Sequence, residues 1–261
     1  MSNPVNNNSF KRNGPFEKRI HEIDFIRGIL ILFVLMDHIF WNLYSYGQSW
    51  NPQAFAFFNW YWHSVIRMVV QFFILCLFCF ISGVSCAFSK NNWKRGGQMV
   101  ILALLISVIT NLVQSWGIIK QNVRIDFNVI AVLAWSTVTY CFFQEKSYKT
   151  LLAFSVGALL FAYIGIPIIR SIPGSENAYV PMLWRPEGQA DHMALFPYIS
   201  FFYAGAIFSR FFYKDKKSLF YKRYEFERPI CFIGRHTLSI YLGHQLLIIP
   251  LFLLINFFVV G

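Results

Sequence analysis

Long apolar runs separated by short polar segments dominate the sequence. The runs are close to the roughly 20 residues that a helix needs to cross a bilayer. Backbone polar groups inside lipid need partners within their own segment, and strands of a membrane barrel would alternate apolar with polar positions, so the runs favour helices. We predict an all-α, polytopic membrane protein with seven spans, at residues 26–46, 65–88, 98–116, 127–143, 150–169, 193–212 and 230–256.

The composition agrees with this class. Hydrophobic residues make up 56% of the 261 residues and charged residues only 13%. Residues 1–24 are polar and rich in asparagine, and we interpret them as a disordered cytoplasmic tail ahead of a single transmembrane domain, 25–261. The first apolar run is long and is not followed by a small-residue cleavage site, so we expect a retained span rather than a signal peptide.

The basic residues predict the orientation. They gather before the first span and in the segments 90–95, 146–149 and 210–235, which places these segments and the N-terminus in the cytoplasm and the C-terminus outside. Basic residues that flank spans also meet anionic lipid. The net charge of +11 therefore does not indicate nucleic-acid binding, and we expect a multi-pass protein of the cell membrane.

The first span, "RGILILFVLMDHIF", carries polar residues deep in an apolar helix. Arg27 and His38 are eleven residues apart, so they return to within about 20° of one helix face and lie about 16 Å apart along the axis. Asp24, three residues before Arg27, is spaced to pair with it. Ionisable residues at such depth are costly, which points to a functional site at Asp37 and His38. A helix-packing hydrogen bond through His38 is the structural alternative.

Two further spans carry polar side chains. His63, Arg67 and Gln71 recur at i, i+4 and i+8, which predicts one polar stripe on a single helix, entered from the outer side. His244 and Gln245 interrupt the last span, either as structural groups or as part of the cavity that holds His38.

The outer segments 47–63 and 170–192 are predicted to be loops. Their tryptophans and tyrosines fit an aromatic belt at the headgroup level or a platform on which sugars stack, and the second loop contains Asp191 and His192 at its end. Cys76 and Cys79 share a helix face without a second pair of ligands, so we interpret them as buried thiols and predict no metal site.

Four stretches resemble one family. "RIHEIDFIRGILILFVLMDHIF" resembles the start of bacterial members of the heparan-alpha-glucosaminide N-acetyltransferase catalytic-domain family, with an Arg-Gly and a His eleven residues after the Arg. The same spacing is similar to that of the wider membrane acyltransferase group, including acyltransferase family 3. The stretches "FCFISGVS", "ADHMALFPYISFFYAGAIFSR" and "IGRHTLSIYLGHQ" are similar to later family motifs. One motif departs: where members often have Phe-Gly-Val-Leu-His, this chain has Asn128 and Ala131 in place of the Gly and the His.

The resemblance implies transfer of an acetyl group from cytoplasmic acetyl-CoA to a hydroxyl or amine of an extracytoplasmic glycan or glycolipid. Basic side chains at the cytoplasmic edge suit the phosphates of coenzyme A, and the 16 Å rise from Arg27 to His38 is comparable to a pantetheine arm. The residues expected to bind coenzyme A are Arg27, Arg95 and Arg235. Those expected to act in catalysis are His38 and Asp37, and those expected to bind the acceptor are Asp24, His63, Arg67, Gln71, Asp191, His244 and Gln245.

The sequence leaves two mechanisms open, with His38 either a general base in a ternary complex or a carrier of the acetyl group. A rival function is a small proton-coupled transporter in which Asp37, His38 and His244 form a relay. The chain shows neither the internal repeats nor the paired broken helices typical of carriers. A membrane scaffold without catalysis is the third alternative.

Overall fold

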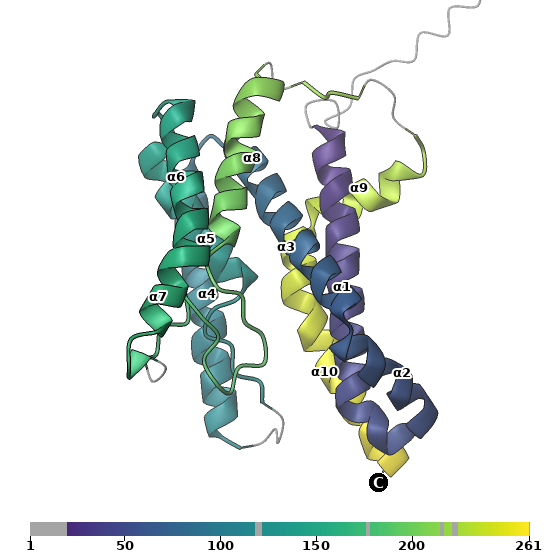
Figure 1. Ribbon diagram of the computed structural model, residues 1–261. Coiled ribbons are helices and arrows are strands. Elements are labelled where there is room, and N and C mark those ends of the chain that lie inside the picture. Colours follow the sequence, from purple (N-terminus) through teal and green to yellow (C-terminus); the bar gives the residue numbers. More distant parts are fainter. Residues whose placement is uncertain (1–19, 118–121, 176–177, 215–216, 221–223, 261) are drawn as a thin grey trace, which may run out of the picture.

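The computed structural model describes residues 20–260 except 118–121, 176–177, 215–216 and 221–223. Within this part of the chain every regular element is a helix (Figure 1). The elements are α1 (His21–Trp50), α2 (Pro52–His63), α3 (Val65–Cys86), α4 (Asn92–Ser115), α5 (Val129–Phe143), α6 (Tyr148–Leu160), the π-helical turn η1 (Phe161–Gly165), α7 (Ile166–Arg170), α8 (Tyr198–Phe212), α9 (Glu227–Arg235) and α10 (Thr237–Val260).

The all-α class and the membrane character are confirmed. Four helical segments are long and apolar enough to cross a membrane: α3, α4, the continuous run α6–η1–α7 and α10. The other three predicted spans correspond to α1, α5 and α8, which fall outside this set of four. Seven crossings and the orientation of the termini therefore stay predictions.

The start of the chain differs from the expectation in two places. Helix α1 begins at His21, so residues 21–24 form its first turn instead of belonging to a tail. The remaining tail, 1–19, lies outside the described residues. The predicted outer loop 47–63 is wrong, because α1 continues to Trp50 and α2 occupies most of the rest. Pro52 opens α2, where its fixed φ and its missing N–H cost nothing.

Two predicted continuous helices are broken. The stripe of His63, Arg67 and Gln71 does not lie on one helix, because α2 ends at His63 and Ser64 caps α3 by accepting a hydrogen bond from the amide of Arg67. The predicted span 230–256 is likewise two helices, since α9 ends at Arg235 and α10 starts after His236.

Close helix pairs hold the bundle together. α1 packs against α2, α9 and α10, α3 packs against α8, and α4 packs against α5. Gly83 of α3 touches α8 so closely that a Cβ at this position would overlap the carbonyl oxygen of Phe202, and Gly28 of α1 is equally close to Ile230 of α9. Phe202 and Tyr203 fill the core between α3, α5 and α8. Figure 1 shows α4–α8 on one side of the molecule and α1, α2, α9 and α10 on the other.

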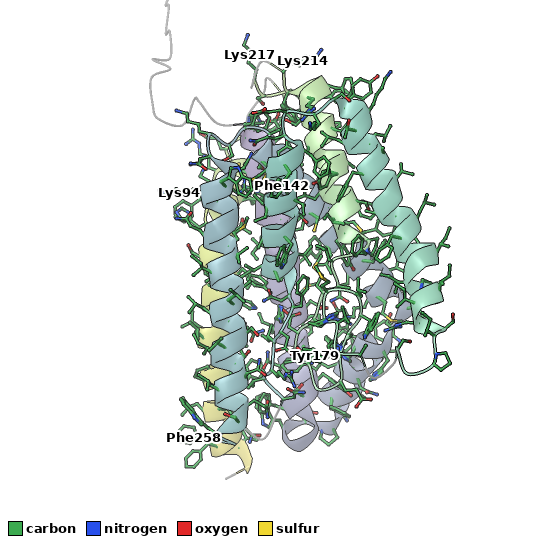
Figure 2. The ribbon with its side chains drawn as sticks, turned by 90° about the vertical axis from the view of Figure 1, so that its left-hand side faces the viewer. Lys94, Phe142, Tyr179, Lys214, Lys217 and Phe258 are labelled. Atoms are coloured by element: carbon green, nitrogen blue, oxygen red, sulfur yellow. The ribbon has the colours of Figure 1, made fainter. Side chains whose placement is uncertain are left out.

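The two ends of the bundle differ in charge. Figure 2 places Lys94, Lys214 and Lys217 at one end, which we call the basic end, and Tyr179 and Phe258 at the other, the far end. The N-terminus of α1 lies at the basic end, and α2 lies at the far end (Figure 1). Positive charge concentrated on one side is the pattern expected for a cytoplasmic face.

Candidate active site

A cavity of about 560 Å³ lies between α1, α3, α4, α10 and the segment before α8. The lining residues of α1 and α4 lie in the second halves of these helices, which start at the basic end. The cavity therefore lies in the half of the bundle nearer the far end. Six of the sequence-predicted site residues line it: Asp37, His38, Arg67, Gln71, Asp191 and Gln245. Side chains from four separate parts of the sequence therefore converge on one space.

His38 is held from two sides. Its Nδ1 lies 2.8 Å from the amide Nε2 of Gln245, and its ring centroid lies 4.7 Å from that of His244. Both partners come from α10, which packs directly against α1. In the described orientation the amide N–H of Gln245 donates to Nδ1, so a neutral His38 ring carries its proton on Nε2.

His244 is buried behind His38. Its Nδ1 lies 2.5 Å from the carbonyl oxygen of Tyr241, which can only accept, so Nδ1 carries a proton and Nε2 of the neutral ring is a lone pair. Within the described structure, that Nε2 and the Oε1 of Gln245 are buried without a hydrogen-bond partner. Unpartnered buried polar atoms are rare, and here two stand beside the same imidazole.

Asp37 is bound to arginine and tyrosine. The guanidinium of Arg67 donates from Nη2 to Oδ2 at 2.6 Å and from Nε to Oδ1 at 2.9 Å, and the hydroxyl of Tyr61 donates to Oδ1 at 3.1 Å. The ring of Trp62 covers the guanidinium at 3.7 Å. Burial and the neighbouring Asp37 carboxylate raise the pKa of Tyr61 to about 12, so this phenol stays protonated and donates. The described bonds of Asp37 thus fix the wall of the cavity.

Asp191 and His192 reach the cavity from the segment before α8. Asp191 accepts a hydrogen bond at 3.1 Å from the hydroxyl of Tyr241, one helical turn before Gln245. His192 donates from Nε2 to the carbonyl oxygen of Pro181 at 2.7 Å, and burial lowers its pKa. His192 therefore stays neutral at neutral pH.

Asp126 anchors this segment, and sequence reasoning missed it. Its carboxylate accepts hydrogen bonds from Arg124, Asn111, Tyr179 and Gln189. Burial works against the charge, but these four donors outweigh it and hold the pKa of Asp126 below its usual value. A lone acidic residue just before the helix that starts at residue 129 was the signal in the sequence; its partners, up to 63 residues away, were not visible there.

The backbone pairs alongside this anchor. The amide of Ala190 donates to the carbonyl oxygen of Arg124 at 2.8 Å, and that of Met193 donates to Phe127 at 3.0 Å. The segment 190–193 is thereby fixed against 124–127, with Asp191 and His192 turned to the cavity.

The remaining predicted site residues lie elsewhere. Asp24 is buried and accepts a hydrogen bond at 3.2 Å from Nε of Arg235, so the carboxylate bridges α1 and α9 near the start of α1. Arg27 lies one turn further along α1, and Arg95 lies in the first turn of α4. His63 is exposed on α2, where its Nδ1 donates to the carbonyl oxygen of Asn59, and it does not line the cavity.

A smaller cavity of about 60 Å³ adjoins the large one. Both are lined by Gln71, Asp191 and His192, and the smaller one extends along α1 to Val34 and Ile31. Ile31 is one helical turn from Arg27. The small cavity, lined mainly by apolar side chains, thus lies along α1 on the side of the large cavity nearer the basic end. No cluster of three metal-binding side chains occurs among the described residues.

The fold and the site define a helical membrane protein with a polar cavity, walled by an ion pair and holding a fixed imidazole. The comparison with family models gives the family: the model described as heparan-alpha-glucosaminide N-acetyltransferase, catalytic, matches residues 19–246. The chain belongs to this family, a family of membrane acetyltransferases. The searches of curated proteins and of solved structures each gave no match.

Proposed function

We propose that this protein moves an acetyl group from acetyl-CoA, bound at the basic end, to a hydroxyl or amine of a glycan held in the large cavity. The observation that carries the proposal is the position of His38. It lines the cavity, its Nδ1 is fixed by Gln245, and it lies on the same continuous helix as Arg27, about 16 Å away along the axis.

The basic end supplies the donor site of this proposal. Arg27, Arg95 and Arg235 lie on three different helices there, and guanidinium groups bind phosphate oxygens with paired hydrogen bonds. The small cavity along Ile31 and Val34 supports a path for the narrow pantetheine arm between that end and His38. With the basic end in the cytoplasm, the acceptor is reached from outside.

The orientation of the Gln245 amide determines which ring nitrogen of His38 carries the proton. When Nε2 of Gln245 points toward the ring, Nδ1 of His38 accepts its hydrogen bond and the proton of the neutral ring sits on Nε2 of His38. In that state Nε2 of His38 cannot take a proton from a neutral substrate. Turning the amide by half a rotation presents Oε1 to an Nδ1–H and frees the ring Nε2 as a base. The turn breaks no hydrogen bond of Oε1, which has no partner among the described residues, and it reverses the direction of the bond to Nδ1.

The chemistry then balances in one of two ways. As a base, His38 takes the proton of the acceptor while the new bond forms at the thioester carbonyl carbon; the carbon–sulfur bond breaks, and the proton passes to the thiolate. As a nucleophile, Nε2 of His38 first forms the bond to that carbon and expels the thiolate; the acceptor then bonds to the same carbon as its bond to Nε2 breaks, and the proton of the acceptor passes to the thiolate. His244, buried against His38, is a positioning residue in both cases.

The test uses the protein purified into phospholipid nanodiscs, with acetyl-CoA and glucosamine. His38→Gln should lower transfer by about 100-fold or more, because glutamine keeps a hydrogen bond but takes up no proton near neutral pH. His236→Gln is the matched control, since His236 is exposed between α9 and α10 and its Nδ1 donates to the carbonyl oxygen of Phe232 in α9. Coenzyme A affinity, measured by calorimetry, should be equal in all three proteins.

Two results would count against the proposal. A folded His38→Gln protein that transfers acetyl at the normal rate would leave the histidine as a packing group. The contact between His38 and His244 also suits a proton relay. Proton movement into proteoliposomes without consumption of acetyl-CoA would therefore favour the transporter.

A further inference from the structure

A second cavity lies on the other side of the Asp37–Arg67 ion pair. It has a volume of about 310 Å³ and sits between α1, α2 and the first half of α3. Asp37, Arg67 and Gln71 line both this cavity and the large one. Apart from these three, its walls consist mainly of apolar side chains, among them Met36, Trp60, Ile66, Val70 and Ile74. We call it the apolar crevice.

The apolar crevice opens on the side of the bundle. Ile66 is 71% exposed and Val70 is 45% exposed, and both lie on α3, a helix long and apolar enough to cross a membrane. Large apolar side chains that face outward from such a helix meet hydrocarbon chains. The crevice therefore receives lipid rather than water.

The two cavities differ in what they can hold. The large cavity presents carboxylate, imidazole and amide groups, which suit hydroxyl and amine groups. Beyond the ion pair the apolar crevice offers only a few polar side chains, Gln71, Tyr61 and Ser64, so burying a sugar there would leave most of its hydroxyl groups unpaired. A molecule that fills both needs a polar head and a hydrocarbon chain, joined at the level of Asp37 and Arg67.

We propose that the acceptor is a lipid-anchored glycan, whose hydrocarbon chain lies in the apolar crevice while its head group lies beside His38. This inference rests on the proposed acetyl transfer. Lipid tails are as apolar as the crevice, so moving a chain from bilayer to crevice contributes little to affinity. The crevice acts by holding the head group at one depth and in one orientation, which raises the rate of attack on the thioester.

The experiment compares two acceptors with the same head, glucosamine and dodecyl glucosaminide, in phospholipid nanodiscs. Wild-type protein should use the dodecyl compound at least ten times more efficiently, as kcat/KM. Val70→Trp places an indole ring in the wall of the crevice, where it obstructs a hydrocarbon chain, and should remove that advantage while leaving transfer to glucosamine unchanged. Val69→Trp is the matched control, because Val69 is 48% exposed on the same helix but does not line the crevice.

Equal efficiency for both acceptors in the wild-type protein would overturn the inference while leaving the proposed transfer intact. Equal losses for both acceptors in Val70→Trp would also overturn it, since the crevice would then be a site for structural lipid. Transfer to neither acceptor would contradict the proposed function. Binding of the dodecyl chain in the crevice is then measured directly by crosslinking. A photoreactive benzoylphenylalanine at position 70, but not at position 69, should crosslink to labelled dodecyl glucosaminide. Equal crosslinking at both positions would refute the inference.

Discussion

The Asp37–Arg67 ion pair predicts a large loss of stability when one partner is removed and a recovery when both are neutralised. The side chain of Arg67 is 9% exposed and that of Asp37 is 21% exposed, and two hydrogen bonds of 2.6 and 2.9 Å join them. Arg67→Met leaves the carboxylate without its counter-charge in a largely apolar wall. Breaking a buried pair in this way costs about 3–5 kcal/mol.

The double variant, Asp37→Asn with Arg67→Met, removes both charges. The asparagine Oδ1 can still accept the hydrogen bond from Tyr61, whose phenol stays protonated because burial and the Asp37 carboxylate raise its pKa to about 12 in the wild-type protein. Neutral replacement of a buried pair is often nearly neutral in stability. We expect the double variant to lie within about 1 kcal/mol of the wild type, which requires a coupling of at least ~2 kcal/mol.

Thermal denaturation in one detergent measures the effect. For a domain of this size about 1 kcal/mol corresponds to roughly 2–4 °C, so Arg67→Met should lower Tm by roughly 6–20 °C and the double variant by less than about 4 °C. Arg228→Met is the control, since Arg228 forms an exposed pair with Glu225 and should change Tm little.

A double variant as unstable as Arg67→Met would refute the reasoning, because the loss could not then come from an unpaired charge. Its activity also decides the role of Asp37. Since the described bonds of Asp37 go to Arg67 and Tyr61, we expect the stable double variant to retain transfer within about tenfold of the wild type. A loss of about 100-fold or more in a folded double variant would instead place Asp37 in the chemistry, as the sequence suggested.

Substitutions at two further residues, Arg27 and Gln245, test the two ends of the proposed pathway. Arg27→Ala should weaken coenzyme A binding by about 1.5–3 kcal/mol through loss of a charge-assisted hydrogen bond, and unchanged affinity by calorimetry would reject Arg27 as a phosphate ligand. Gln245→Glu should retain transfer, because a carboxylate accepts from Nδ1–H of His38 as the acid of a catalytic triad does, whereas Gln245→Leu should lower it by about tenfold or more. Normal transfer by Gln245→Leu would show that the amide does not set the state of the ring.

Local patterns predicted the helices but not all their ends. Apolar runs predicted the all-α membrane class, and the arrangement of motifs predicted the family that the match over residues 19–246 confirms. The sequence pattern did not predict the break at Ser64, because His63, Arg67 and Gln71 fit a helical period across it. The capping serine outweighed that period, since its hydroxyl satisfies an amide at the start of α3.

The sequence could not predict which polar side chains on different helices contact one another. The Asp24 carboxylate bonds to Arg235, 211 residues away, because α9 packs against α1, and spacing along one helix could not reveal this partner. Asp37 and His38 are neighbours in sequence but face different partners, since consecutive residues of a helix point about 100° apart. A single sequence shows which polar residues enter the membrane and not which helix meets them.

Position 131 bears on how far the family pattern applies to this chain. Where family members often have a histidine, Ala131 is buried in the core, and Asn128 caps α5 by accepting from the amides of Ile130 and Ala131. The imidazole pair of this chain comes instead from α1 and α10, with ring centroids 4.7 Å apart. In the proposed transfer His38 carries out the chemistry and His244 positions it, so a third imidazole from α5 is not needed. We therefore expect acetyl transfer in this chain without a histidine at position 131.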